Sequence, residues 1–465
     1  MTRQSQPERL PLAARLGACG PERSLSDAER SFTLAQLAGG SILRGRAPTF
    51  AGRNVLVATN RQIEAAAALL ELDGLANRIL LTPPDLSGEH RQSVLADAAI
   101  NAVVASDTAP WQALGVQLAV SPQLPPVARA EDAVLPVHDT NWLMLTSGTT
   151  GRPKIVAHTL DALTGSIGGD VASNAAAPVW ATFYDIRRYG GLQILLRSLL
   201  GGGSLVLSHP GEGLVEHLNR LIEHGVTHIS GTPSHWRKAL MSDTISKFRP
   251  GYVRLSGEIA DQAVLDSLKR TFPQASIGHA YASTEAGVGF AVDDGLEGFP
   301  AALVDKPNGV EMKVVDGTLH IRSKRAALSY VGDSAPALSD EDGFVDTGDM
   351  VGLRGGRYYF VGRRGGIINV GGLKVHPEEV EAVINTHSDV RISRVRARKS
   401  PITGAIVVAD VMLAQRGDSE REKQIKAEIL DQCRASLPSH KVPAMVAIVD
   451  EIAVSAGGKL ERGGA

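Results

Sequence analysis

One stretch of the sequence, LTSGTTGRPKIVAHT at 145–159, limits most strongly what the chain can fold into. The residues at 143–145 are apolar and are typical of the end of a buried strand. The run 146–151 carries hydroxyls and almost no side-chain bulk, so its backbone N–H groups can face a ligand. Such N–H groups favour phosphate oxygens, and Lys154 adds a positive charge beside them. The stretch therefore predicts a strand that ends in a polyphosphate-binding loop.

Two other interpretations of this stretch are weaker. A flexible surface linker is seldom bounded by a buried strand on one side and a Pro-Lys pair on the other. A Walker-type loop needs a lysine that follows a free N–H and precedes a magnesium-binding hydroxyl. Here Pro153 has no N–H and Ile155 has no hydroxyl. The order Thr-Ser-Gly-Thr-Thr-Gly-x-Pro-Lys instead resembles the phosphate loop of the adenylate-forming (AMP-binding) superfamily, which includes acyl-CoA and aryl-CoA synthetases, peptide-synthetase adenylation domains and luciferases.

The composition is that of a globular protein. At 465 residues the chain is expected to form two or three folding units. A formal charge of -2 and 4% aromatic residues give no electrostatic or stacking surface for nucleic acid. Cys19 and Cys433 are the only cysteines, so we expect core thiols, not disulfides or a thiolate metal site. No apolar run has the length of a signal peptide or a membrane span, which predicts a cytoplasmic protein without membrane insertion.

Short apolar runs alternate with helical patterns on both sides of the loop. Consecutive strand–helix units of this kind predict a parallel sheet covered by helices. Before the loop, strands are expected at 54–59, 78–81 and 101–105, and helices at 63–72 and at 31–37 with Ser31 as its N-cap. After the loop, helices are expected around 192–200 and 214–221, and strands at 205–207 and 226–230.

The pattern changes in the last third of the chain. From 309 to 323 apolar residues alternate with polar ones around Asp316-Gly317, which predicts a hairpin, and further strands follow at 350–353 and 358–361. Gly365 and Gly366 then permit large backbone changes, and Pro377 suits a first helical position. We expect an α/β protein with a large N-terminal domain of parallel αβ subdomains plus a small antiparallel β unit, residues 1–363. A small, mobile α+β C-terminal domain, residues 364–465, would follow with Gly365 as the hinge. Its predicted elements are a strand at 405–413, a helix at 420–436 with Ile425, Ile429 and Cys433 inward, and a strand at 445–449.

Three further motifs stand in the order that the superfamily has them. The first, HAYASTEAG at 279–287, resembles its Tyr-Gly-x-Thr-Glu motif, with Ala282 in place of the glycine. By that resemblance Tyr281 stacks on adenine, Thr284 contacts the α-phosphate, and Glu285 binds Mg²⁺, together with Thr146 in the phosphate loop. Taken alone, Thr-Glu would indicate only a helix N-cap followed by a first-turn acid.

The second motif, DTGD at 346–349, and the third, GKLER at 458–462, resemble the superfamily's ribose and C-terminal lysine motifs. The resemblance implies that Asp349 binds both ribose hydroxyls, that Arg363 supports the ribose, and that Lys459 is catalytic, with Thr284 and Glu285. Asp349 alone would indicate no more than a surface turn. The full nucleotide-binding set implied is Thr146, Ser147, Gly148, Thr149, Thr150, Gly151, Lys154, Gly257, Glu258, Tyr281, Ser283, Asp349 and Arg363. Of these, Gly257 and Glu258 would line the adenine pocket.

The resemblance implies an ATP- and Mg²⁺-dependent enzyme that activates a small carboxylic acid as an acyl-adenylate and transfers the acyl group to a thiol. Coenzyme A is the first acceptor considered, and the phosphopantetheine arm of an acyl carrier protein acting in trans is the second. A third hypothesis, from another class, is a nucleotide-binding module without ligase activity. The presence together of Lys154, Glu285, Asp349 and Lys459 speaks against it, because a binder has no need of a lysine so far from its phosphate loop.

The sequence does not identify the acid, but one segment bears on it. FYDIRRYG at 183–190 contains Tyr184, Asp185, Arg187 and Arg188, many polar groups for a fatty-acid pocket. If they line the acid pocket, the preferred acid is compact and carries a second polar group, because a buried charge needs a partner. The alternative is that the acidic and basic residues pair locally at the start of a helix.

Overall fold

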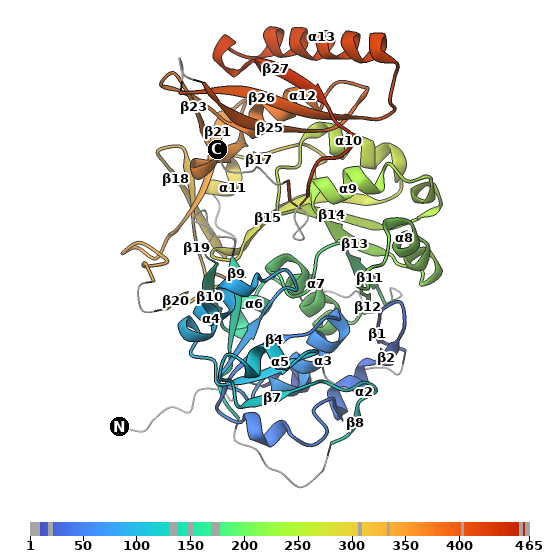
Figure 1. Cartoon of the computed structure of the whole chain (residues 1–465), viewed down its shortest axis with the longest axis vertical. Helices are drawn as coiled ribbons and strands as arrows, with labels where there is room; N and C mark the ends of the chain where they lie inside the picture. The colour runs from blue at the N-terminus through green and yellow to red at the C-terminus, as the bar shows by residue number, and fades with distance from the viewer. Residues whose placement is uncertain are drawn as a thin grey trace. The chain divides into compact units, whose positions relative to one another are not determined.

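A computed structural model describes residues 10–16, 22–129, 137–146, 153–168, 177–305, 309–332, 335–400, 404–454 and 459–460 (Figure 1). By contacts between residues the chain forms two compact units. The first unit comprises Met1–Ser230, Ala282–Val288 and Ser323–Asp342. The second comprises Gly231–Tyr281, Gly289–Arg322 and Gly343–Ala465. Among the described residues, none of the helices is both long and apolar enough to cross a membrane.

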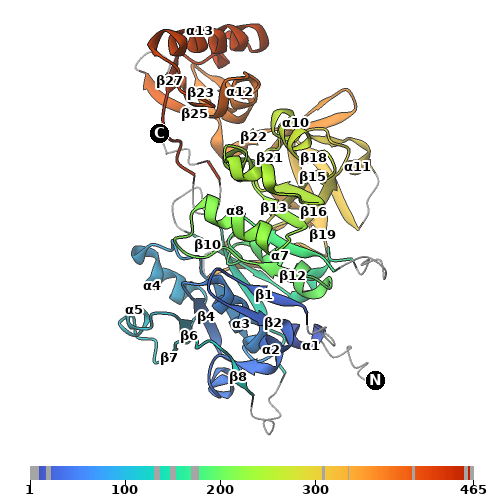
Figure 2. The ribbon, with the colours of Figure 1, turned by 90° about the vertical axis from the view of Figure 1, so that its right-hand side faces the viewer.

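A seven-stranded mixed sheet forms the core of the first unit, in the order β20-β10-β9-β5-β4-β6-β7. The five strands from β9 to β7 are parallel, and β10 is antiparallel to both of its neighbours. The alanine-rich helix α3 (Gln62–Leu72) is almost entirely buried and contacts β4 and β5. It lies beside β4 in Figure 2. The predicted strands before the loop are thus confirmed. The strands are β4 (Asn54–Ala58), β5 (Arg78–Leu81), β6 (Ala102–Ala105), β7 (Leu118–Val120), β9 (Asn141–Thr146), β10 (Lys154–His158) and β20 (Ser329–Val331); the shorter helices are α1 (Leu12–Arg15), α4 (Gly88–Asp97), α5 (Ala109–Gln112) and α6 (Leu160–Thr164).

Further strands of the first unit are hydrogen-bonded in the order β13-β11-β12-β1-β2. The predicted helices and strands after the loop are confirmed, with β13 two residues later than expected. The predicted helix at 31–37 begins later too: Thr33, not Ser31, is its N-cap, because 31–33 pair as a strand with β1. The elements are β1 (Ser24–Ser26), β2 (Ser31–Thr33), α2 (Leu34–Gly39), β11 (Val179–Thr182), α7 (Tyr189–Leu200), β12 (Ser204–Val206), α8 (Leu214–Glu223) and β13 (His228–Gly231).

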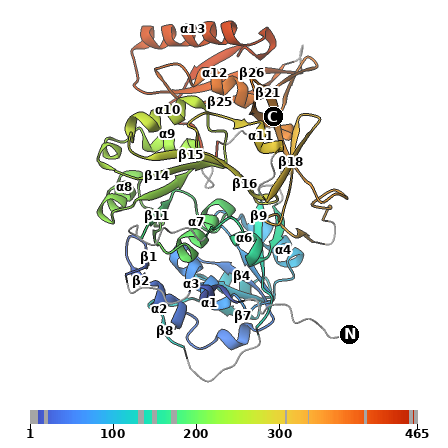
Figure 3. The ribbon, with the colours of Figure 1, turned by 180° about the vertical axis from the view of Figure 1, so that it is seen from behind.

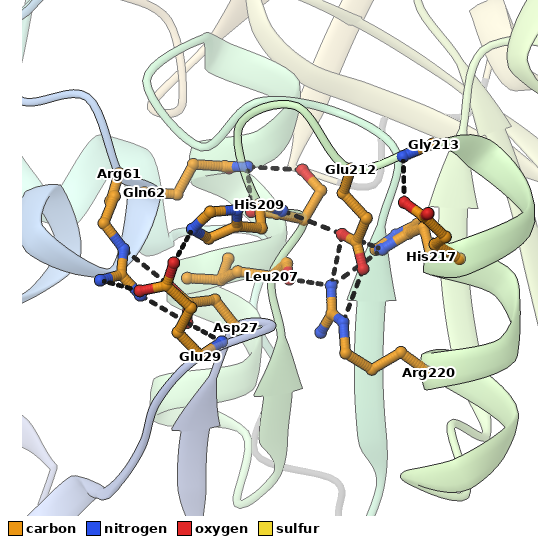
Figure 4. Close-up of polar contacts among 12 residues, drawn as sticks. Asp27, Glu29, Arg61, Gln62, Leu207, His209, Glu212, Gly213, His217 and Arg220 are labelled. Atoms are coloured by element: carbon orange, nitrogen blue, oxygen red, sulfur yellow. Dashed lines mark hydrogen bonds and ion pairs between the residues drawn. The ribbon is translucent and has the colours of Figure 1, made fainter.

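Charged side chains connect the β1–β2 hairpin, the start of α3 and the segment after β12 (Figure 4). Arg61, at the N-cap of α3, pairs with Asp27 at 2.7 Å and with Glu29 at 2.9 Å. His209 lies 3.3 Å from the same Glu29. Because both hairpin carboxylates are engaged from outside the hairpin, the N-terminal strands are held to the remainder of this unit.

Glu212 lies at the centre of the second half of this network. Its buried carboxylate accepts hydrogen bonds from Arg220 at 2.6 and 2.7 Å and from the backbone N–H of His209 at 3.0 Å, and it contacts His217 at 3.1 Å. Burial raises the pKa of Glu212, but the hydrogen bonds from His217, Arg220 and the His209 backbone outweigh it, so the pKa lies below its ordinary value. The carboxylate is therefore ionised in the folded protein at neutral pH.

In the second unit, β14 (Tyr252–Ser256) and β15 (Ser276–Ser283) pair in parallel, and the helices α9 (Pro233–Ala239) and α10 (Gln262–Thr271) belong to the same segment. A separate five-stranded sheet has the order β17-β22-β21-β19-β18. Its β18–β19 turn has φ of 49° at Asp316 and 74° at Gly317, as the predicted Asp-Gly hairpin requires. These strands are β17 (Phe299–Pro300), β18 (Val310–Val315), β19 (Thr318–Ser323), β21 (Val345–Arg354) and β22 (Arg357–Arg363).

The C-terminal part of the second unit has its own sheet, β25-β26-β27, with α13 lying along it (Figures 1 and 3). The predicted inward residues Ile425, Ile429 and Cys433 are buried, and burial raises the pKa of the Cys433 thiol to about 11, so this cysteine is an unreactive core thiol. The two units do not divide the chain at Arg364, and that domain boundary stays a prediction. The elements are β23 (Ile368–Val370), β24 (Leu373–Val375), α12 (Pro377–Ile384), β25 (Val390–Ser400), β26 (Gly404–Leu413), α13 (Ser419–Ser436) and β27 (Met445–Ile448).

The Glu212 network predicts a pH-dependent loss of stability. Glu212→Gln should lower the free energy of unfolding at pH 7 by about 3 kcal/mol, because Arg220 loses its buried counter-ion. Since the folded-state pKa of Glu212 is lowered, the contribution of its charge is present above the ordinary pKa of 4.5 and is lost as the pH falls below it through the folded-state pKa. Urea unfolding at pH 7 and pH 3 should therefore show a smaller difference between wild type and variant at pH 3.

Glu216→Gln, in the first turn of α8, is the matched control. Glu216 is exposed and accepts a hydrogen bond from the Gly213 N–H at 2.9 Å, a role that glutamine can keep. Its free energy of unfolding should stay within about 0.5 kcal/mol of wild type. Equal losses in the two variants would show that the Glu212 charge does not stabilise the fold.

Candidate functional site

Strand β10, which follows the predicted phosphate loop, has two different faces. Ile155 and Ala157 lie in an apolar core cluster of the first unit. Because side chains alternate along a strand, Lys154, Val156 and His158 occupy the opposite face. Lys154 is exposed and is paired in register with Thr146 of β9. The strand thus places the predicted phosphate-binding lysine at the point where the loop begins; the loop residues Ser147, Gly148, Thr149, Thr150 and Gly151 lie outside the described residues.

Tyr330 of β20 connects two of the predicted site residues. In the β10–β20 pair, Tyr330 stands opposite Val156. The Lys154 ammonium lies 5.1 Å from the centroid of the Tyr330 ring, and the Tyr330 hydroxyl donates to a carboxylate oxygen of Glu285 at 3.4 Å. The lysine predicted to bind phosphate and the glutamate predicted to bind Mg²⁺ are therefore brought to the same tyrosine. Sequence reasoning did not select Tyr330, because only its register with β10 reveals it.

The segment that carries Glu285 is fixed mainly by its backbone. The carbonyl of Glu285 accepts a hydrogen bond from the Ala327 N–H at 2.9 Å, and the Ser283 hydroxyl accepts one from the Ala286 N–H at 3.0 Å. Ser283, predicted to bind nucleotide, thus also holds the turn that contains Thr284. At Gly287 φ is +75°, and a Cβ there would lie 2.1 Å from the Arg325 carbonyl oxygen, so only glycine fits.

His158 and Tyr189 form a buried aromatic pair beside Thr284, with ring centroids 5.5 Å apart. Burial lowers the pKa of His158 to about 4, against a smaller opposing effect of the Thr284 backbone, so the imidazole is neutral at pH 7. Burial likewise raises the pKa of the Tyr189 hydroxyl. Among the described residues, neither side chain has a hydrogen bond of regular geometry. Both are neutral polar groups. Tyr189 lies in the segment 183–190 that was predicted to bear on the acid, whereas His158 was not selected from the sequence.

A second group of predicted residues lies in the second unit, where β21 and β22 pair Asp349 with Arg363. One oxygen of the Asp349 carboxylate accepts from Arg363 Nε at 2.8 Å, and the other accepts from the Tyr281 hydroxyl at 2.6 Å. Burial, and then the neighbouring Asp349 charge, raise the pKa of Tyr281, so its hydroxyl stays a donor. The Tyr281 ring stacks with Phe290 and Phe360 at 5.6 and 5.4 Å. The three predicted residues are thus one hydrogen-bonded group.

Lys459 also lies in the second unit, close to two predicted adenine-pocket residues. Gly257 has φ of +86°, and a Cβ on it would lie 3.7 Å from Lys459 Cε. Glu258 accepts a hydrogen bond from the backbone N–H of Leu460 through one oxygen and from that of Ser234 through the other, both at 2.9 Å. Glu258 therefore fixes the backbone that carries Lys459, and its role toward adenine stays a prediction.

Of the four residues predicted for the acid pocket, Asp185 and Arg187 pair locally, as in the alternative, whereas Arg188 pairs with a residue distant in the sequence. Arg187, whose side chain is 3% exposed, pairs with Asp185 at 2.6 Å and donates to the backbone carbonyls of Thr59 and Asn60. Arg188 pairs with Asp85 at 2.5 Å and is more exposed. Tyr184 is buried and would contact a Cβ at Gly190. The charges of these two arginines are thus used within the first unit, and their role in acid binding stays a prediction without support from these contacts.

The predicted metal site has few ligands. Among the described residues, no group of three or more His, Cys, Asp or Glu side chains could hold a metal ion. A single carboxylate, Glu285, fits Mg²⁺, which is usually held by one or two carboxylates together with substrate phosphates. This donor set does not suit a structural zinc site.

Comparison with known proteins gives two matches to protein families. Residues 40–325 match the AMP-binding enzyme family, and residues 379–459 match the AMP-binding enzyme C-terminal domain. A 2-succinylbenzoate–CoA ligase of Bacillus pumilus (strain SAFR-032) is 27% identical over 357 residues, covering 70% of this chain and 68% of that ligase. The 4-coumarate–CoA ligase 3 of Arabidopsis thaliana is 27% identical over 356 residues, covering 70% of this chain but only 62% of its own length. Among solved structures, an anthranilate CoA ligase, AuaEII, in complex with anthranoyl-AMP has the same fold, with a TM-score of 0.83, 20% identity and coverage of 99% of this chain and 97% of that one.

The contacts of Arg187 predict a structural role. Arg187→Ala should lower the free energy of unfolding by about 3–5 kcal/mol, because it leaves Asp185 as an unpaired, largely buried charge. Arg188→Ala, which removes a more exposed pair, should cost about 1 kcal/mol or less. Chemical denaturation measures both. Equal stability of the two variants, together with a changed preference among acids in Arg187→Ala, would contradict the structural role and support a role of Arg187 in binding the acid.

Proposed function

Since the chain belongs to the AMP-binding enzyme family, we propose that it is an ATP-dependent, AMP-forming acid–thiol ligase. It activates a small carboxylic acid as an acyl-adenylate and transfers the acyl group to a thiol, that of coenzyme A first of all. The observation that supports the proposal is that Lys154 and Glu285 both contact Tyr330 in the first unit. A cation for phosphate and a carboxylate for a metal are what a nucleotidyl-transfer site needs.

In the first half-reaction a carboxylate oxygen of the acid forms a bond to the α-phosphorus of ATP, and the bond from that phosphorus to pyrophosphate breaks. Catalysis is mainly positioning and neutralisation of charge. Lys154 would neutralise phosphate charge at the loop, Thr284 would contact the α-phosphate, and Lys459 would neutralise the charge that develops as pyrophosphate leaves. In the second half-reaction the thiol sulfur attacks the acyl carbon, and AMP leaves.

Glu285 would hold Mg²⁺, with the Thr146 hydroxyl as a second predicted ligand. When bound, this ion supplies neutralisation of the triphosphate charge. The hydrogen bond from the Tyr330 hydroxyl uses one lone pair of the Glu285 carboxylate and leaves the other lone pairs for a ligand.

The nucleoside would be held by residues of the second unit. Asp349 accepts from Arg363 and Tyr281 through different oxygens, which fixes the plane of the carboxylate. Each oxygen keeps a lone pair, so both ribose hydroxyls could donate to it. The stacked ring of Tyr281 would contact adenine.

The acid is proposed to be a compact aromatic acid, since the relatives' names include 2-succinylbenzoate, 4-coumarate and anthranilate as substrates of those proteins. The neutral pair His158 and Tyr189 beside Thr284 is compatible with an uncharged second polar group on such an acid. A cytoplasmic location stays a prediction from the sequence.

A screen for pyrophosphate release over aromatic acids, dicarboxylic acids, amino acids and fatty acids, with coenzyme A added or omitted, tests the proposal. We expect release with an aromatic acid and formation of its CoA thioester. Release without a CoA thioester would favour loading of a carrier protein in trans. No release with any acid, despite binding of MgATP, would favour the non-catalytic binding module.

Lys459→Ala should reduce ATP-dependent adenylation by about 10²-fold or more, by analogy with the loss of a preorganised donor to a developing charge. Synthetic acyl-AMP should still be converted to thioester at close to the wild-type rate, because that half-reaction expels no pyrophosphate. Lys423→Ala, on the surface of α13 where Lys423 is 67% exposed, is the control and should leave both rates unchanged. Equal losses in both half-reactions would contradict the role of Lys459.

Gly365 lies in the short turn Arg364–Gly366 between β22 and β23, where a hinge is proposed. Gly365→Pro fixes one backbone dihedral and removes an N–H, so it should block one half-reaction much more than the other if the C-terminal domain rotates between them. The two half-reactions are measured separately with acid plus ATP and with synthetic acyl-AMP. Gly365→Ala should be tolerated in both; equal loss of both in Gly365→Pro, or loss of neither, would contradict the hinge.

A further inference from the structure

We propose that Tyr330 is a positioning residue that keeps the Lys154 ammonium and the Glu285 carboxylate apart and available to MgATP. The inference rests on the proposed function, in which these two groups bind phosphate and Mg²⁺. Its starting point is that one side chain contacts both groups, at 5.1 Å from ring to ammonium and 3.4 Å from hydroxyl to carboxylate.

The position of Tyr330 follows from the backbone. Two hydrogen bonds hold its segment on either side: the Ala327 N–H donates to the Glu285 carbonyl at 2.9 Å, and the Leu328 N–H donates to the Ala157 carbonyl at 2.8 Å. The register then puts Tyr330 opposite Val156, on the same face of β10 as Lys154. Lys154 is therefore its diagonal neighbour across the strand pair, within reach of an aromatic ring.

The two contacts of Tyr330 are of different kinds. The ring face attracts the ammonium through its quadrupole, and the hydroxyl donates to the carboxylate. Each contact stabilises a charge without neutralising it. Among the described residues, Lys154 and Glu285 form no ion pair with each other, although each contacts the same side chain. The tyrosine thus separates two charges that would otherwise cancel each other.

The hydroxyl and the ring of Tyr330 should therefore have separate effects. Loss of the hydroxyl should affect Glu285 and hence the requirement for Mg²⁺. Loss of the ring as well should affect Lys154 and hence the affinity for the phosphates. A tyrosine that only filled space would give neither pattern, because its loss would lower stability and all kinetic parameters without regard to Mg²⁺.

Tyr330→Phe and Tyr330→Leu test this. In Tyr330→Phe the Mg²⁺ concentration for half-maximal pyrophosphate release should rise about three- to tenfold, the range for the net loss of an ordinary hydrogen bond, because the contact to Glu285 is long at 3.4 Å. KM for the acid should not change. In Tyr330→Leu, KM for ATP should also rise about two- to fivefold, the range for a lost cation–π contact at an exposed site.

A readout that needs no turnover is the rise in melting temperature caused by ATP, measured with Mg²⁺ and with EDTA. Tyr330→Phe should lose most of the Mg²⁺-dependent part of that rise and keep the part seen in EDTA, whereas Tyr330→Leu should lose both. Tyr359→Phe is the matched control, because the Tyr359 ring also carries a cation, Arg354 at 4.6 Å, on the β21–β22 hairpin. It should behave as wild type.

Wild-type Mg²⁺ dependence and a wild-type ATP-induced shift in Tyr330→Phe would overturn the inference. So would equal losses in Mg²⁺ and EDTA, which would indicate a merely structural role. If the wild type binds MgATP but activates no acid, and Tyr330→Phe still loses the Mg²⁺-dependent shift, the positioning role stands and the proposed function fails.

Discussion

The alternation of side chains along β10 is the constraint on which the candidate site depends. Ile155 has to face the apolar core of the first unit, where burial of such a side chain contributes about 1.5–3 kcal/mol. Lys154 is therefore turned to the opposite face. A shift of one residue in the pairing would turn the lysine toward the apolar core cluster, which is unfavourable for a charge. The same hydrophobic pattern that builds the sheet thus orients the predicted phosphate-binding cation.

The carboxylate that completes this face comes from a distant part of the sequence. Glu285 is held by a backbone hydrogen bond from Ala327 and by a close approach of chains at Gly287 that excludes any side chain. Because backbone contacts fix the segment, the Glu285 side chain is not needed to hold it in place. Its carboxylate is therefore available to bind a ligand. Pairing of β20 with β10 brings Tyr330 to the same place.

Local features of the sequence predicted much of this arrangement, and long-range pairing explains what they missed. The Asp316-Gly317 hairpin and the helix starting at Pro377 depend on turn and cap chemistry within a few residues, and both were found. On chemistry alone Ser31 is at least as good an N-cap as Thr33. Residues 31–33 pair with β1 as a strand, however, so the helix begins after Thr33. Tyr330 could not be selected, because its importance comes entirely from the register of β20.

The predicted acid pocket shows a further limit of sequence reasoning. A run of charged residues predicts either a polar pocket or local pairing, and the choice depends on where each side chain points. Arg187 points to the carbonyls of Thr59 and Asn60, far away in sequence, and its remaining charge is neutralised by Asp185. No local pattern contains that information.

The way in which charged side chains pair distinguishes those that stabilise the fold from those predicted to bind a ligand. Glu212 with Arg220, and Arg187 with Asp185, are buried pairs in which each charge meets its partner directly, as low dielectric requires. Lys154 and Glu285 are opposite charges on one tyrosine without such a pair between them in the part of the chain that the structure describes. Asp349 is paired, yet Arg363 and Tyr281 use different oxygens and leave acceptor capacity on each. The predicted site residues therefore differ from the structural ones in the charge or lone pairs that their contacts within the fold leave available. A ligand can bind only to such available groups.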